Sequence, residues 1–126
     1  MLIQAAQRDD VPALKKLLAA GVSPNHGNVI GQTALHIACM WGNYKSVGVI
    51  LDAGANTDAT NQFGTTPLLA LARMEKGTLR GRIESAKKMV EAGANLKVED
   101  GDGKLAWEIV SEQAGSEELA KVLTPK

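Results

Sequence analysis

The sequence predicts an all-α solenoid of about four helix–turn–helix repeats. Two series of glycines carry this prediction. The first series closes an apolar run in each unit, at intervals of 33 and 39 residues: Gly21, Gly54 and Gly93. The second series opens the next unit at the same intervals: Gly31, Gly64 and Gly103. One period of 33 residues with a single six-residue insertion explains both series, and such a period with two short helices per unit is typical of stacked repeat proteins.

The unit at residues 31–61 shows how a repeat is built. Thr33 can cap a helix by accepting a hydrogen bond from a free backbone N–H, and apolar residues follow at helical spacing over 34–40. Gly42 ends this helix, because glycine is unfavourable in a helix interior and suits a left-handed cap. A second apolar run begins at Val47 and ends before Gly54. The expected unit is therefore a helix, a tight turn, a second helix and an extended loop.

Short motifs inside these units resemble the ankyrin-repeat family. Thr-Ala-Leu-His at 33–36 and Thr-Pro-Leu-Leu at 66–69 stand where the family has Thr-Pro-Leu-His. Gly-Ala-Asn at 54–56 and again at 93–95 stands where the family has Gly-Ala-Asp/Asn. The resemblance covers nearly the whole chain. It implies short β-hairpin finger loops that project from the stack, a structural hydrogen bond from His36 within its turn, and a function in protein–protein recognition.

A single domain is expected over residues 1–126, with repeats at approximately 1–27, 28–60, 61–99 and 100–126. The first and last units depart from the motif and are expected to act as caps. An Asn or Asp precedes each opening glycine by three residues, and its side chain can bond its own turn backbone. The six-residue insertion falls within 73–82, between the two helices of the third unit. It is either a binding element or a tolerated loop.

The bulk composition narrows the function classes. The formal net charge is +0, so no global field favours nucleic acid or a membrane. Cys39 is the one cysteine and cannot form an internal disulfide, which favours a reducing compartment. The sequence has no leader pattern and no run of 18 apolar residues. We expect a cytoplasmic protein, with a nuclear location as the alternative, and the chain is either complete or the repeat domain of a larger protein.

No catalytic or metal-binding pattern is found. His36 and Cys39 are three residues apart, but no further soft ligand lies near them in the sequence. Cys39 stands where the family has a packed alanine, so a buried thiol is expected. The sequence therefore predicts a protein that is not an enzyme and that has no cofactor or metal.

The resemblance places partner contacts at the finger tips and at the ends of the first helices. In the second unit these positions are Val29, Ile30, Gln32, Met40 and Trp41; in the third they include Gln62, Phe63, Thr65, Arg73 and Met74. Several of these residues are apolar, at positions that the family usually exposes to solvent. Exposed apolar patches mark interaction sites. Tyr44 is expected to border the patch. The alternative for Trp41 is that it folds over its turn and packs against the insertion.

Cations gather around the insertion, at Arg73, Lys76, Arg80 and Arg82. We expect this chain to be an adaptor or an inhibitor that is monomeric alone. The cations are then expected to give charge complementarity to its protein partner. The alternative function is binding of an acidic ligand, such as a phosphate, a lipid headgroup or a nucleic acid, through this basic loop. The loop has no aromatic residue for base stacking, which weakens the case for nucleic acid.

Overall fold

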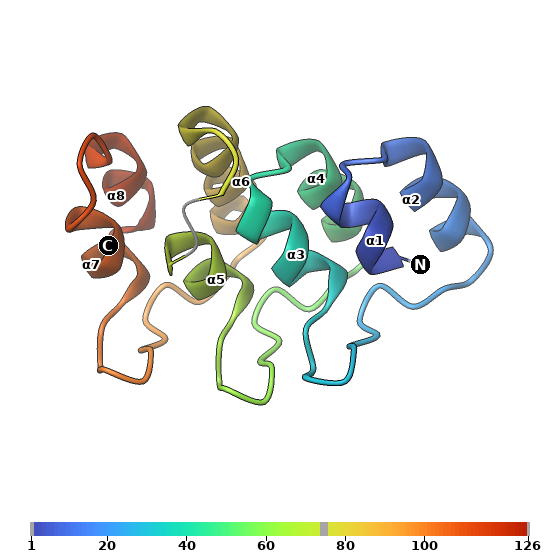
Figure 1. The fold of residues 1–126 in the computed structure, drawn as a ribbon, viewed down its shortest axis with the longest axis horizontal. Helices are drawn as coiled ribbons and strands as arrows, with labels where there is room; N and C mark the ends of the chain where they lie inside the picture. Colours follow the sequence, from blue (N-terminus) through green and yellow to red (C-terminus); the bar gives the residue numbers. More distant parts are fainter. Residues whose placement is uncertain (1, 74–75, 126) are drawn as a thin grey trace.

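The computed structural model describes residues 2–73 and 76–125, and this part of the chain contains eight α-helices in four consecutive pairs. The first helices of the pairs form one layer: α1 (Leu2–Gln7), α3 (Ala34–Trp41), α5 (Pro67–Arg73) and α7 (Ala106–Ser111). The second helices form another: α2 (Val11–Ala19), α4 (Tyr44–Asp52), α6 (Leu79–Glu91) and α8 (Glu117–Leu123). Successive pairs stack side by side, and the loops between pairs project from the same side (Figure 1). The predicted all-α solenoid is confirmed.

One apolar core runs along the stack between the two layers. Its large members include Leu14, Leu35, Ile50, Leu71 and Met89, all without solvent exposure. Fully buried alanines lie in α1, α3 and α5, and their small side chains let neighbouring helices approach closely. Cys39 belongs to this core, and burial raises the pKa of its thiol well above the usual range. The predicted buried, inert thiol is therefore confirmed.

Three identical turns form the ends of the projecting loops. We call them finger one (residues 28–32), finger two (61–65) and finger three (100–104). In finger one, Oδ1 of Asn28 accepts from the N–H groups of Ile30 and Gln32 at 3.1 and 3.0 Å. Asn61 does the same in finger two and Asp100 in finger three, at 2.9–3.1 Å. The predicted side-chain bonds to the turn backbone are confirmed.

The fingers have the outline of a hairpin, but within the described residues none of their arms forms a β-strand. The N–H of Asn28 donates to the Gln32 carbonyl at 2.9 Å, whereas the Gln32 N–H donates to the Asn28 side chain. The Asn28 side chain thus accepts the hydrogen bond that the Asn28 carbonyl would accept at the start of a β-ladder. The opening glycine sits in the left-handed region, with φ of 82° at Gly31, where other residues are strained.

Hydrogen bonds along the loops join the first repeat to the second and the second to the third. Oδ1 of Asn25 accepts from the Asn56 N–H at 2.7 Å, and Oδ1 of Asp58 accepts from the Asn95 N–H at 2.8 Å. Finger one and finger two are also linked by a bond from the Gln62 N–H to the Ile30 carbonyl at 2.8 Å. The spacing between fingers is therefore fixed by bonds as well as by helix packing.

His36 bridges two repeats from a fully buried position. Its Nδ1 accepts from the Thr33 N–H at 3.1 Å, so the neutral ring carries its proton on Nε2, which donates to the Thr65 carbonyl at 2.8 Å. Thr33 in turn caps α3 by accepting from the His36 N–H at 3.4 Å. The structural role implied for His36 is confirmed, and burial lowers the pKa of its imidazole.

The extra residues of the third unit are divided between a turn and a helix. Thr78 caps α6 by accepting from the Gly81 N–H at 2.9 Å, and α6 reaches 13 residues, against nine in α2 and in α4. The insertion also lies against the α3–α4 turn. A side chain at Gly77 would collide with the Trp41 carbonyl oxygen, and one at Gly81 with the Gly42 carbonyl oxygen. Glycine is required there because the two backbones touch.

Arg82 is the residue for which the sequence-based expectation is wrong. Instead of offering charge at the surface, its side chain is buried, with 4% of the residue exposed. One guanidinium nitrogen donates to the carbonyls of Leu71 and Ala72 and to Oε1 of Gln113, at 3.0–3.2 Å. Arg82 therefore joins the end of α5 to the turn between α7 and α8, and its charge is not available to a partner.

Trp41 follows the alternative considered above, since it is half-buried and packs on the core. The ammonium of Lys76 lies 4.9 Å from the centroid of its ring, a cation–π contact between the insertion and α3. Met74, expected at the partner surface, lies outside the described residues. None of the helices described here is long and apolar enough to span a bilayer.

The His36 contacts predict a pH-dependent stability. Burial lowers the pKa of His36 below the 6.5 of an unperturbed imidazole, so the unfolded chain binds a proton at a pH where the folded chain does not. The free energy of unfolding should therefore fall as the pH drops below 6.5, by at most about 1.4 kcal/mol per pH unit. Urea unfolding between pH 5 and 8 measures this slope.

The matched variant is His36→Leu, because Leu69 occupies the corresponding position of the next repeat and is buried. His36→Leu should lower the stability by roughly 1–3 kcal/mol, since the Thr33 N–H and the Thr65 carbonyl lose their partner. It should also flatten the slope between pH 5 and 6.5. The same slope in both proteins would mean that His36 is not the titrating group.

The buried position of Arg82 predicts that lysine cannot replace it. The lysine ammonium lies on a shorter side chain and is more strongly hydrated than a guanidinium, so it reaches these acceptors less well and costs more to bury, and Arg82→Lys should cost roughly 1–3 kcal/mol. Arg80→Lys is the control, because Arg80 is exposed two residues away, and it should change the stability by less than about 0.5 kcal/mol. Equal urea midpoints for the two variants would contradict the buried role of Arg82.

Candidate protein-binding surface

A groove lies between finger one and finger two, below the ends of α3 and α5. Its volume is about 200 Å³. Ile30, Gln32 and Met40 line one side. The other side is formed by residues of finger two and of α5: Asn61, Phe63, Thr65, Ala70 and Arg73. We call this hollow the finger groove.

Large apolar side chains are exposed on the two fingers that flank the groove. Val29, at the tip of finger one, is 100% exposed, and Phe63, on finger two, is 70% exposed. The third large exposed apolar side chain of the described residues, Leu79, belongs to α6 and is 42% exposed. Exposed apolar area of this kind gains free energy when a partner covers it. Among the described residues, the finger tips therefore have the most exposed apolar area for a partner to cover.

The structure brings together six of the predicted contact residues in the finger groove: Ile30, Gln32, Met40, Phe63, Thr65 and Arg73. Val29 and Gln62 are exposed beside it at the finger tips. Trp41 and Tyr44 are half-buried and do not line it. Lys76, Arg80 and Arg82 belong to the insertion and also lie outside its lining.

Sequence reasoning did not include Asn61 and Ala70 among the contact residues. Asn61 was recognised for its turn, and the same residue also forms part of the groove wall. Ala70 shows why the groove exists, because a small side chain on α5 leaves room between the fingers. The signal that could have identified it is a small residue on the inner helix beside a large apolar finger residue.

His36 and Cys39 are engaged within the fold. Both ring nitrogens of His36 are hydrogen-bonded, and the Cys39 thiol is buried and protonated. Within residues 2–73 and 76–125, no group of three or more His, Cys, Asp or Glu side chains is placed to hold a metal ion. The finger groove offers apolar contact, amide and hydroxyl groups and one guanidinium, which suits binding.

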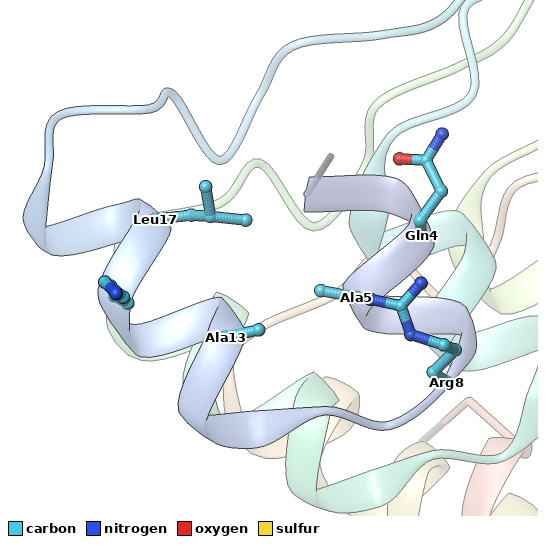
Figure 2. A pocket seen from close by; sticks show the side chains of 6 residues that line it. Gln4, Ala5, Arg8, Ala13 and Leu17 are labelled. Atoms are coloured by element: carbon cyan, nitrogen blue, oxygen red, sulfur yellow. The ribbon is translucent and has the colours of Figure 1, made fainter.

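A second hollow lies at the N-terminal end of the stack, between α1 and α2, and has a volume of about 450 Å³. Ala13 and Leu17 of α2 face Ala5 of α1 across it, with Arg8 at its edge (Figure 2). It lies on the side of this pair that faces away from α3 and α4. In the other pairs the corresponding side is covered by the preceding pair, so this hollow is a direct result of stacking.

The sequence is similar to proteins of widely different kinds. It is 38% identical over 100 residues to an E3 ubiquitin-protein ligase KEG of Arabidopsis thaliana, covering 78% of this chain and 6% of the relative. It is 36% identical over 86 residues to a potassium channel KOR1 of rice (Oryza sativa subsp. japonica), covering 68% of this chain and 10% of the channel. It is 26% identical over 120 residues to an ankyrin repeat-containing protein P1E11.10 of Schizosaccharomyces pombe, covering 94% of this chain and 54% of that protein. The chain thus spans a small part of the ligase and the channel and about half of the third relative.

The family description "Ankyrin repeats (3 copies)" matches residues 2–100, which include three of the four helix pairs and the first two fingers. Ankyrin repeats are generally non-catalytic modules for protein–protein interaction. The matched residues, the repeated helix pairs and the buried His36 agree, and the chain belongs to the ankyrin-repeat family.

Proposed function

We propose that this chain is a protein-interaction module, an adaptor or an inhibitor of its partner, which binds through the finger groove and the adjoining finger tips. The observation that carries the proposal is the preformed hollow whose apolar lining includes Ile30, Met40 and Phe63, with Val29 fully exposed on the adjoining finger. Aromatic and methionine side chains are enriched in interface cores. Gln32, Gln62 and Arg73 add polar contacts at its edge.

The rigidity of the surface supports this function. Each finger is closed by two bonds to its Asn or Asp side chain, and the first two fingers are joined by the Gln62–Ile30 bond. A surface that already has its bound shape loses little conformational entropy on binding, and this favours affinity.

Binding of an acidic ligand through the insertion has weaker support. Arg82 is buried, and the ammonium of Lys76 lies over Trp41, so two of the four cations of this region are engaged within the fold. Arg73 lines the finger groove instead. Of these four cations Arg80 is thereby left exposed, in the first turn of α6, and this is little charge with which to hold a phosphate.

We also propose that the chain is a monomer in the cytoplasm, which is a reducing compartment. Its single thiol is buried and forms no disulfide.

The test is affinity capture with variants that differ in one surface only. The double variant Val29→Ser/Phe63→Ser removes the two most exposed apolar side chains and should weaken binding of a specific partner at least tenfold, since two hot-spot contacts lose about 2 kcal/mol or more. Leu79→Ser is the control, because Leu79 is an exposed apolar residue on α6. Mass spectrometry identifies the captured proteins, and calorimetry then measures the affinity of the identified partner at 50 mM and 500 mM salt.

The proposal is supported if one protein is lost with Val29→Ser/Phe63→Ser, is retained with Leu79→Ser, and keeps most of its affinity at high salt. A captured protein that ignores the finger variant would contradict it. A ligand that is released at high salt and is lost with Arg80→Gln would instead favour the acidic-ligand alternative.

A further inference from the structure

We propose that the partner presents an extended segment with an apolar side chain for the finger groove and a lysine or arginine about three residues away for finger three. This inference rests on the proposed function and names the chemistry of the segment that the surface accepts. Three features of the surface support it: the row of side chains on the three fingers, the charge of finger three, and the spacing of the repeats.

The three fingers place equivalent residues in one row. In each finger, the residue two positions after the Asn or Asp donates its N–H to that side chain, and these residues are Ile30, Phe63 and Asp102. Because the bonds are the same, the three side chains occupy the same place on their fingers. Figure 1 shows the fingers side by side along the stack. A partner lying across them meets two apolar residues and then a carboxylate.

Finger three is acidic in a way that leaves its charge available. Glu99 and Asp102 are exposed, and the neighbour of Asp102 at the tip is Gly101, which carries no side chain to cover it. Bonds from the backbone N–H groups of Lys104 and Asp102 hold the pKa of Asp100 below its usual range, so this carboxylate stays ionised.

The cations near finger three do not cancel this charge. The Lys104 ammonium lies 2.6 Å from a carboxylate oxygen of Glu112, so the charge of Lys104 is matched by a carboxylate outside the finger. Lys97 is exposed in the turn before the finger, and its bond to the Asn95 side chain comes from the backbone N–H, so its ammonium offsets part of the charge. Arg73 and Lys104 both lie close enough to stabilise the charge of Asp100. Arg73, Lys97 and Lys104 thus face four carboxylates, those of Glu99, Asp100, Asp102 and Glu112, and a net negative charge remains to attract a cation.

The repeat spacing sets the distance between the two anchors. Neighbouring helix axes in packed helical layers lie about 8–10 Å apart, and the fingers follow the same spacing as the helices that carry them. An extended segment in the polyproline II conformation advances about 3.1 Å per residue with three residues per turn, so side chains three residues apart lie on the same side. An apolar side chain at Phe63 and a basic side chain at Asp102 are therefore separated by about three residues of the partner segment.

The probe is a phage-displayed library of random 12-residue peptides, selected in parallel on three immobilised proteins. These are the wild-type chain, Glu99→Gln/Asp102→Asn, and Glu117→Gln/Glu118→Gln. The last variant removes the same charge from exposed residues of α8. Asp102→Asn preserves the turn, because Asp102 contributes its backbone N–H to the hydrogen bond with Asp100.

Wild type and the α8 control should both select peptides with an apolar residue and a lysine or arginine about three positions away. The Glu99→Gln/Asp102→Asn pool should keep the apolar residue and lose the enrichment of basic residues. Single wild-type peptides should bind this variant about twofold to fivefold more weakly at low salt, since an exposed ion pair contributes up to about 1 kcal/mol.

Selection on Phe63→Ser separates this inference from the function on which it rests. Peptides that depend on Phe63 but show no basic enrichment would overturn the inference and leave the proposed function standing. Peptides that bind Phe63→Ser as well as wild type, or a library that yields nothing above a blank surface, would overturn both.

Discussion

The bond between an Asn or Asp side chain and its own turn is the interaction on which the binding face depends. The backbone N–H groups of a projecting loop cannot all find partners in a helix or a sheet, and unpaired N–H groups cost free energy. At Asn28, Asn61 and Asp100, one side-chain oxygen takes two of them. Each loop can therefore stand away from the helices and still keep one shape. Without that local bond, the finger residues would have no fixed positions relative to one another.

Some residues of a finger fix its shape and others only contact a partner, and this separation explains how one scaffold can carry different specificities. Shape comes from the Asn or Asp, the opening glycine, and the bonds to the next repeat through Asn25, Asp58 and His36. The residue at the tip contributes only its backbone to that shape. Its side chain is therefore free to vary, as Ile30, Phe63 and Asp102 illustrate. The variation changes what is bound and leaves the stack intact.

Local rules made most of the scaffold predictable from the sequence. The glycine period, the helix caps, the finger turns and the roles of His36 and Cys39 all depend on residues within one or two neighbouring units. Arg82 could not be placed in this way, because its partners include Gln113, 31 residues away, and a lone arginine in a basic stretch normally lies in water. Trp41 was ambiguous for the same reason, since its exposure depends on how the insertion folds. The groove residues were found where family position and apolar character agreed.

The insertion shows why charge in a sequence is a weak guide to a charged surface. Its glycines let its backbone touch the α3–α4 turn, and this close approach brings Lys76 over Trp41. Arg82 is directed inward, where it satisfies carbonyls at the end of α5 that the helix itself leaves open. Both cations thus stabilise contacts between repeats. Asp100 holds the turn of finger three, whereas the neighbouring acidic residues Glu99 and Asp102 are exposed to solvent. The molecule therefore presents a face that is apolar and then acidic, although the basic stretch is the more conspicuous feature of the sequence.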